Sequence, residues 1–310
     1  MSVNHPKVAV LLAAYNGMDW IAEQLDSILK QTNLCVSVFI SVDPSTDGTD
    51  SLCSVYAERN ANVTLLPAVG QFGGASRNFF RLIRDVDLSA FDYVAFSDQD
   101  DIWYSDKLHR ATSAMVSGNY DAYSSNVIAF WPDGRRMLVD KAQPQVRWDH
   151  AFEAAGPGCT YVMNRRLADA FKASLVANWA ACQRITLHDW YCYAYARNHD
   201  FRWFIDPVPS MDYRQHAGNQ VGANTGIAAF TTRLKKILGG WWPEQVVLIN
   251  DLTGGTSGLT LEGKTAFLRL AFQARHCRRR PRDKRLFIIA CMAASLCKVS
   301  VSDAQSPSRR

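Results

Sequence analysis

The sequence lacks several features that define common classes of protein. None of its eight cysteines occurs in a C-x-x-C spacing, which excludes a zinc knuckle or small disulfide scaffold and favours reduced thiols. The longest apolar run near the C-terminus, 286–296, is shorter than the roughly 20 residues of a membrane-spanning helix. The apolar run 8–14 has no basic segment before it, so we expect no signal peptide. These absences favour a cytoplasmic protein.

Composition and charge divide the chain into two parts. Of the 310 residues, 48% are apolar and 20% charged, which is typical of a globular protein. Residues 1–225 hold 19 Lys and Arg against 24 Asp and Glu, whereas residues 226–310 hold 15 against 5. We therefore expect a main domain at 1–225 and a basic extension at 226–310.

Apolar segments of strand length alternate with helical patterns along the first part. The strand-like runs are 8–14, 36–42, 63–66 and 93–96, and helices are expected after each of the first three, the second and third at 50–59 and 75–84. This alternation predicts an α/β fold with a mostly parallel sheet. Further on, we expect strands at 120–130, 161–163 and 201–205 and a helix at 187–197. The basic part is expected to be helical at 233–238, 261–276 and 284–298.

An acidic cluster, "FSDQDDIW" at 96–103, stands where the fourth strand should end. Asp98 and Asp100 form an Asp-x-Asp pattern, and Asp101 follows directly. In a parallel sheet this edge binds ligands, and carboxylates there can hold Mg²⁺ or Mn²⁺, which would neutralise a diphosphate leaving group. The alternative is a solvated turn that caps the next helix.

The second strand also ends in carboxylates, in "SVDPSTDGTD" at 41–50. Asp43 is placed to accept hydrogen bonds from a nucleobase or a ribose. Asp47, which precedes Gly48, is better explained as a turn residue.

Six motifs in order resemble a known family: "VLLAAYNG", "ISVDPSTDGTD", "FGGASRNF", "SDQDDIW", "HDW" and "YRQHAGNQVG". Together they are similar to the inverting family 2 glycosyltransferases of GT-A fold, in particular to rhamnosyltransferase-like members that act on surface polysaccharides. The resemblance covers about residues 6–222. It implies a mixed, mostly parallel sheet flanked by helices, and it leaves the basic extension outside.

The resemblance also implies roles for individual residues. The nucleotide and donor sugar would be bound by Ala13, Tyr15, Asp43, Arg77, Asp98 and Arg214, with Glu23 in support. Asp100 and His216 would hold the divalent cation. Val42 stands where family members often carry the first Asp of a pair, so that first carboxylate is missing here.

The general base for an inverting transfer would be Asp189, in "LHDWYCY". The alternative is that Asp189 only favours a helix N-terminus while the following Trp packs in the core. The acceptor side would include Asp101, Gly158, Cys159, Thr160, His188 and Trp190. "GPGCT" at 156–160 is equally well explained as an ordinary tight turn.

The basic segment "RHCRRRPRDKR" at 275–285 has no aromatic array or recognition motif beside it, so we expect no nucleic acid as a partner. An anionic membrane surface, on the inner face of the cytoplasmic membrane, is one interpretation. A solvated charged turn between helices is the other.

The sequence thus predicts a glycosyltransferase that moves a sugar from a nucleotide diphosphate sugar to a hydroxyl of a surface polysaccharide or lipid-linked oligosaccharide. A catalytically silent nucleotide-sugar or glycan-binding protein is the alternative, and the presence of both Asp100 and Asp189 argues against it. A sugar nucleotidyltransferase should carry a glycine-rich, basic phosphate loop near the first strand, and "AAYNGMDW" is not such a loop.

Overall fold

The computed structural model describes residues 5–216, 239–259 and 265–296. The chain divides into two compact units: unit 1 comprises residues 1–143 and 154–223, and unit 2 comprises residues 144–153 and 224–310. The segment 144–153 thus packs with the C-terminal part. The predicted boundary at residue 225 lies outside the described residues and remains a prediction.

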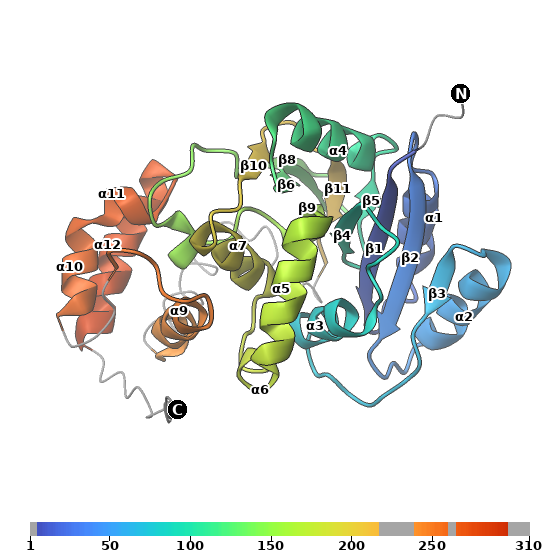
Figure 1. Cartoon of the computed structure of the whole chain (residues 1–310), viewed down its shortest axis with the longest axis horizontal. Coiled ribbons are helices and arrows are strands. Elements are labelled where there is room, and N and C mark those ends of the chain that lie inside the picture. The colour runs from blue at the N-terminus through green and yellow to red at the C-terminus, as the bar shows by residue number, and fades with distance from the viewer. Residues whose placement is uncertain (1–4, 217–238, 260–264, 297–310) are drawn as a thin grey trace. The chain divides into compact units, whose positions relative to one another are not determined.

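Unit 1 is built on a seven-stranded sheet (Figure 1). Its strands are β1 (Lys7–Ala14), β2 (Cys35–Val42), β3 (Val63–Leu65), β4 (Tyr93–Ser97), β6 (Ala122–Ser125), β9 (Val162–Asn164) and β10 (Trp203–Asp206). They lie in the order β10-β6-β9-β4-β1-β2-β3. Only β9 runs antiparallel to its neighbours, β4 and β6. The predicted mixed, mostly parallel sheet is confirmed.

A second sheet of unit 1 contains β5 (Ile102–Trp103), β11 (Met211–Arg214), β7 (Val127–Phe130) and β8 (Arg136–Val139), in that order. The single strand predicted at 120–130 is therefore wrong, because β6 and β7 belong to different sheets. Asn126 separates them: its side-chain amide donates to the carbonyl of Pro207 (2.9 Å) and accepts from the backbone N–H of Lys141 (2.6 Å). These bonds hold the chain where it changes sheets.

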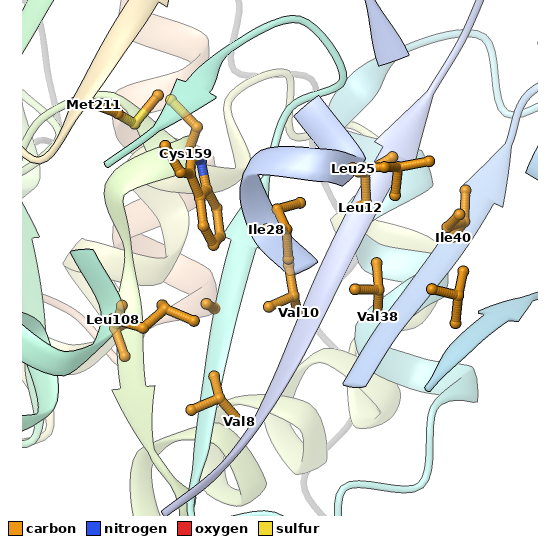
Figure 2. Close-up of a cluster of buried hydrophobic side chains, with 14 of the residues drawn as sticks. Val8, Val10, Leu12, Leu25, Ile28, Val38, Ile40, Leu108, Cys159 and Met211 are labelled. Carbon is orange, nitrogen blue, oxygen red and sulfur yellow. The ribbon is translucent and has the colours of Figure 1, made fainter. Parts of the chain in front are cut away.

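Helices cover both faces of the larger sheet (Figure 1). They are α1 (Ile21–Leu29), α2 (Thr49–Arg59), α3 (Ala75–Asp85), α4 (Lys107–Gly118), α5 (Arg165–Ala177), α6 (Trp179–Cys182) and α7 (His188–Asn198), and a 3₁₀ turn, η2, spans Gly158–Thr160. Val10 of β1 packs in one buried cluster with Leu25 and Ile28 of α1 (Figure 2). On the other face Phe79 of α3 contacts Phe96 of β4, with ring centroids 5.3 Å apart. Because β1 is covered on both faces, its apolar run is continuous.

Unit 2 is helical. It contains the 3₁₀ turn η1 (Asp149–Ala151) and the helices α9 (Trp241–Leu252), α10 (Ala266–Phe272), α11 (Ala274–Cys277) and α12 (Pro281–Leu296). The helical character predicted for 261–276 and 284–298 is confirmed over the described part of each range, whereas 233–238 lies outside it. Phe152 joins Trp242 and Phe287 in an aromatic core. Within the described residues, no helix has the length and hydropathy needed to cross a membrane.

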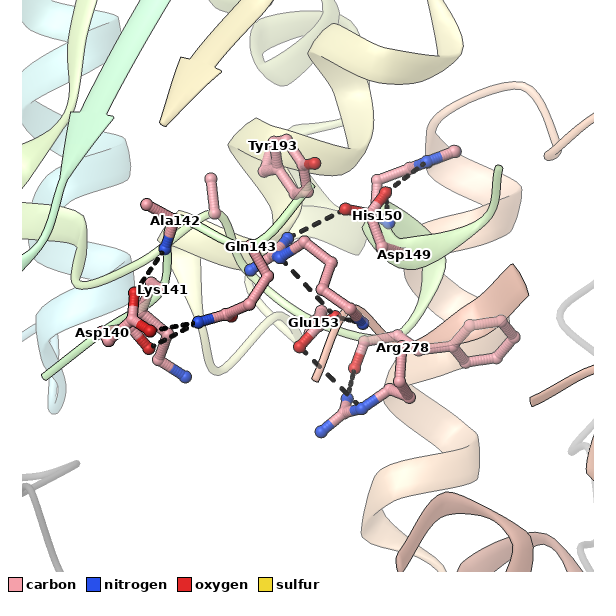
Figure 3. Close-up of polar contacts among 12 residues, drawn as sticks. Asp140, Lys141, Ala142, Gln143, Asp149, His150, Glu153, Tyr193 and Arg278 are labelled. Carbon is pink, nitrogen blue, oxygen red and sulfur yellow. Dashed lines mark hydrogen bonds and ion pairs between the residues drawn. The ribbon is translucent and has the colours of Figure 1, made fainter. Parts of the chain in front are cut away.

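Buried ion pairs hold the segment 144–153 in unit 2 (Figure 3). The guanidinium of Arg279 lies 2.9 Å from the carboxylate of Asp149, and both side chains are almost completely buried. The backbone N–H of Arg279 donates to Glu153 (2.8 Å), and the guanidinium of Arg278 donates to the carbonyl of Phe152 (2.5 Å). Two arginines of the basic segment 275–285 are therefore engaged inside the unit.

Candidate active site

Three neighbouring parallel strands deliver candidate residues to one edge of the sheet. Tyr15 follows β1, Asp43 follows β2 and Asp98 follows β4, and β1 lies between the other two strands. The carboxyl ends of parallel strands form the ligand-binding edge of such a sheet. The predicted convergence of these residues at this edge follows from the strand order.

Gln99, the middle residue of Asp-x-Asp, connects two of these strand ends. Its side-chain oxygen accepts from the backbone N–H of Tyr15 (2.7 Å), and its amide N–H donates to the carbonyl of Tyr15 (2.8 Å). Gly17 allows this approach, since a Cβ there would lie 2.4 Å from the Gln99 oxygen. The sequence does not single out Gln99, because the Asp-x-Asp pattern is defined by its carboxylates. The loops after β1 and β4 are thus joined by one side chain.

Asp43 is buried and holds the loop that precedes α3. One carboxylate oxygen accepts from the backbone N–H of Phe72 (2.6 Å) and the other from that of Gly73 (2.8 Å). Each oxygen keeps further acceptor capacity, because a carboxylate offers about four lone-pair sites. Asp47 accepts from the backbone N–H of Thr49 (3.0 Å), which confirms its interpretation as a turn residue.

Ala13 and Arg77 lie at the same edge of the sheet. Ala13, near the end of β1, is buried. Arg77, in the first turn of α3, is exposed and donates to the carbonyls of Gln183 (3.0 Å) and Phe72 (3.3 Å).

The structure brings together the two predicted metal ligands. The carboxylate of Asp100 lies 2.7 Å from Nε2 of His216, and the imidazole stacks on Trp20 with ring centroids 3.9 Å apart. Arg214 donates through Nε to the backbone carbonyl of Asp100 (2.8 Å) and forms an ion pair with Glu23. A carboxylate oxygen and an imidazole nitrogen are thus held together by residues from three parts of the chain. Both are recognised ligands of divalent metals.

A second cluster lies directly beside this pair. Ligand atoms of Asp98, Asp101 and Cys159 all lie within 4.8 Å of one another, and Asp101 and Cys159 are completely buried. One oxygen of Asp101 accepts from the backbone N–H of Arg214 (3.2 Å), and the other has no hydrogen-bond partner among the described residues. Burial, with the neighbouring charges of Asp100 and Asp189, raises the pKa of Asp98 to about 7. Carboxylates crowded in this way favour the approach of a cation or a proton.

Lys107 is a second residue of this site that lies outside the sequence motifs. It is completely buried at the start of α4, and its Nζ donates to the backbone carbonyl of Cys159 (2.6 Å). Burial lowers the pKa of Lys107 to about 7, against the opposing effects of Cys159, Asp101 and Asp98. A signal was available, because Lys107 lies in the buried stripe of α4 with Leu108 and Ala111, where a charged side chain is unusual.

Asp189 lies in the first turn of α7. One of its carboxylate oxygens accepts from the backbone N–H of Trp190 (2.8 Å), and burial raises its pKa to about 6. Trp190 is buried, as its packing interpretation requires. His188 stacks on Phe79 with ring centroids 4.0 Å apart, and burial lowers the pKa of His188 to about 3. Its imidazole is therefore neutral.

The turn η2 packs against the start of α7. A Cβ at Gly158 would lie 2.7 Å from Nε2 of His188 and 3.1 Å from Cβ of Asp189. Only a residue without a side chain allows this approach. Cys159 and Thr160 are buried, and the Thr160 hydroxyl donates to the carbonyl of Pro157 (2.7 Å). The turn supports Asp189 from inside the protein.

The chain is similar to known glycosyltransferases. The model of glycosyl transferase family 2 matches residues 9–162. The dTDP-rhamnosyl transferase RfbG of Shigella flexneri is 46% identical over 277 residues, which cover 88% of this chain and 96% of that protein. The UDP-Glc:alpha-D-GlcNAc-diphosphoundecaprenol beta-1,3-glucosyltransferase WfgD of Escherichia coli is 24% identical over 177 residues, 54% of this chain and 64% of that protein.

Two solved structures share the fold. S. aureus TarS 1-349 in complex with UDP-GlcNAc has a TM-score of 0.53 at 15% identity and covers 93% of this chain and 88% of its own. The mannosyltransferase PcManGT from Pyrobaculum calidifontis, in complex with GDP-Man and Mn²⁺, has a TM-score of 0.51 at 17% identity, with coverages of 94% and 86%. Their likeness confirms the predicted GT-A architecture. The Shigella relative is 46% identical over 88% of this chain. The chain therefore belongs to glycosyl transferase family 2 and is a glycosyltransferase.

Proposed function

We propose that this enzyme transfers a rhamnosyl group from dTDP-rhamnose to a hydroxyl of a growing surface glycan, with inversion at the anomeric carbon. The donor is supported by the 46% identical relative, which is a dTDP-rhamnosyl transferase. The observation that carries the reaction type is that the candidate base, Asp189, lies near the carboxylates that would bind the donor and its metal ion. Asp189 is close enough to Asp98 to raise the pKa of that carboxyl, and Asp98 in turn lies beside Asp100.

In this proposal Asp189 is the general base. The acceptor oxygen attacks the anomeric carbon, its proton passes to the Asp189 carboxylate, and the bond from the anomeric carbon to the diphosphate oxygen breaks. The nucleoside diphosphate leaves with the electron pair. A pKa of about 6 suits the role, since the carboxylate is ionised at neutral pH yet is more basic than an exposed one.

The nucleotide would bind along the loops after β1 and β2. Ala13, Tyr15 and Asp43 would border the base and ribose, and Asp98 would meet the ribose or the diphosphate. Arg214, next to the Asp100 backbone, would face the diphosphate, and exposed Arg77 would approach a phosphate or the sugar.

Asp100 and His216 would hold Mn²⁺ or Mg²⁺. The residues present fit such an ion, because a carboxylate oxygen and an imidazole nitrogen already converge within 2.7 Å. When bound, the ion would neutralise charge on the leaving diphosphate. Arg214 also orders the site, since it grips the Asp100 carbonyl while paired with Glu23.

The acceptor would be a lipid-linked oligosaccharide or a polysaccharide, and α12 is a candidate contact with an anionic membrane surface. One side of α12 is buried through Phe287 and Cys291, while Ile289 and Met292 on the other are about half exposed. The side chain of Arg282, near the start of the helix, is 72% exposed. Apolar and basic residues together on one helix face are typical of membrane-surface helices.

A donor panel tests the proposal. Release of the nucleoside diphosphate would be measured with dTDP-rhamnose, UDP-GlcNAc and GDP-mannose, each with Mn²⁺ or Mg²⁺ and a lipid-linked acceptor. We expect the highest rate with dTDP-rhamnose and a product whose anomeric configuration, read by NMR, is opposite to that of the donor. Nucleotide binding without turnover of any donor, or a retained configuration, would overturn it.

A further inference from the structure

Lys107 is enclosed by groups that suit an ammonium ion. Its Nζ lies 2.6 Å from the carbonyl oxygen of Cys159, 3.5 Å from the sulfur of Met211 and 3.4 Å from the ring centroid of Trp103. An oxygen lone pair, a thioether and an aromatic face all attract a cation. These partners come from η2, β11 and β5, so one side chain of α4 joins three other elements of unit 1.

The carbonyl that Lys107 holds belongs to the middle residue of η2. On one side of this turn, Gly158 packs against His188 and Asp189 so closely that no side chain would fit. On the other side, the thiol of Cys159 lies within 4.8 Å of the carboxylates of Asp98 and Asp101. The turn therefore lies between the candidate base and the donor-side carboxylate of Asp98, and its position affects the distance between them.

We propose that Lys107 is a positioning residue that fixes η2 and thereby holds Asp189 at the correct distance from the bound donor. The inference rests on the proposed function, since it presumes Asp189 as base and the carboxylates after β4 as the donor side. Transfer depends steeply on this distance, because a displacement of about 1 Å in a catalytic group can cost roughly 100-fold in rate.

The chain offers a matched control for the bond itself. Lys172 on α5 donates through Nζ to the backbone carbonyl of Val86, also at 2.6 Å. Among the residues that the structure describes, no hydrogen bond or ion pair joins Lys172 to a candidate site residue, so Lys172→Met removes the same kind of bond away from η2. Lys107→Met keeps an unbranched side chain that is one heavy atom shorter, and it removes the amino group together with its bond to Cys159 and its contact with the Trp103 ring.

The experiment compares Lys107→Met with Lys172→Met in the full chain. Donor affinity would be measured by the thermal shift with dTDP-rhamnose and Mn²⁺, kcat by nucleoside diphosphate release with acceptor, and donor hydrolysis by the same release without acceptor. For Lys107→Met we expect donor affinity within about twofold of wild type, kcat lower by about 10- to 100-fold, and a lower ratio of transfer to hydrolysis. Lys172→Met should change melting temperature only.

Gly158→Ala would press directly on His188 and Asp189, so it tests how transfer depends on the turn but not the role of Lys107. Lys107→Leu, which also removes the donor, serves if Lys107→Met does not fold. It should show the same pattern of retained donor affinity and reduced kcat. The inference is overturned if the variant that folds keeps wild-type kcat, or loses donor affinity and kcat in parallel. A wild-type enzyme that turns over no donor would instead refute the proposed function, which separates the two failures.

Discussion

The two units bury carboxylates in opposite ways. In unit 2 the buried carboxylate of Asp149 meets the guanidinium of Arg279 at 2.9 Å. In unit 1, Asp98 and Asp101 lie beside Asp100, and the buried cation near them, Lys107, bonds to a backbone carbonyl. One arrangement pairs opposite charges, and the other places like-charged groups side by side, for which we propose a bound cation as the partner.

If the proposed site is correct, this difference separates a structural from a functional use of buried charge. A buried pair that is fully matched costs much when one partner is removed, because the other charge is left alone in a poor solvent. Carboxylates crowded together have raised pKa values and attract cations, which is typical of active sites. Substitutions in the two units should therefore fail in different assays.

The largest effect is expected at Asp189. Asp189→Asn removes the base, so transfer should fall by about 10²- to 10⁴-fold while donor affinity is kept. The melting temperature should not decrease, because a neutral amide replaces a carboxylate whose ionisation is opposed by burial. Nucleoside diphosphate release and thermal unfolding measure the two quantities. A variant that retains more than about a tenth of wild-type transfer would exclude Asp189 as the base.

The opposite result is expected at Asp149. Asp149→Asn removes the nearest counter-charge of buried Arg279 and leaves it the carboxylate of Glu153 at 3.8 Å, so the free energy of unfolding should decrease by up to about 3–5 kcal/mol. Turnover per folded molecule should be retained. Denaturant unfolding measures the first quantity and activity normalised to folded protein the second.

Replacing both partners is the control for Asp149. Asp149→Leu combined with Arg279→Met removes both charges and should cost less stability than Asp149→Asn alone. If the double variant were the less stable one, the pair would not be the source of the loss.

His216→Ala should weaken the metal site without removing it. One of the two proposed ligands is lost, so the Mn²⁺ concentration that gives half-maximal activity should rise by at least about tenfold, the usual cost of losing even an outer-shell partner. Activity should recover at high Mn²⁺. The same titration curve for variant and wild type would show that His216 does not hold the ion.

The pH dependence of the reaction should follow Asp189. Burial raises the pKa of this carboxyl to about 6, and a general base acts only when deprotonated. Below pH 6 the rate of transfer should therefore fall by about tenfold per pH unit, and above it should level off. Measuring kcat from pH 4.5 to 8 with saturating donor tests this. A rate that rises as pH falls through 6 would have the wrong sign.

The smallest effect is expected on the surface of unit 2. Ile289→Ser removes an exposed apolar side chain from α12, and binding to vesicles containing phosphatidylglycerol should weaken by severalfold to about tenfold. Co-sedimentation at low salt measures it, with Ser295→Ala as a surface control. Equal binding by variant and wild type would remove α12 as the membrane contact.

Much of the fold could be predicted from local pattern. Strand β1 is a continuous apolar run from Val8 to Ala14 because helices cover both of its faces, and buried Phe79 and Ile83 of α3 keep helical spacing. The division of 120–130 at Asn126 could not be predicted, because it depends on bonds to Pro207 and Lys141. Likewise, the membership of 144–153 in unit 2 depends on a pair between Asp149 and Arg279, which are 130 positions apart.

In the candidate site, too, residues marked by local sequence pattern could be predicted, and residues defined by long-range contacts could not. Asp43, Asp98 and Asp100 could be found because strand ends and charge mark them in the sequence. The contacts of Gln99 and Lys107 are harder to predict, because they are made to backbone atoms of Tyr15 and Cys159, and any residue type can supply a backbone atom. Only the place of Lys107 in an apolar helix stripe marks it in the sequence.

The Gln99 clamp limits how this enzyme could be re-engineered. Gln99 forms hydrogen bonds with both the N–H and the carbonyl of Tyr15, and its position requires a glycine at Gly17. The loops after β1 and β4 should therefore move together. A graft of a foreign β1 loop, made to change the accepted nucleotide, would also shift the carboxylates of Asp98 and Asp100. Donor exchange should therefore succeed only when both loops are transplanted together.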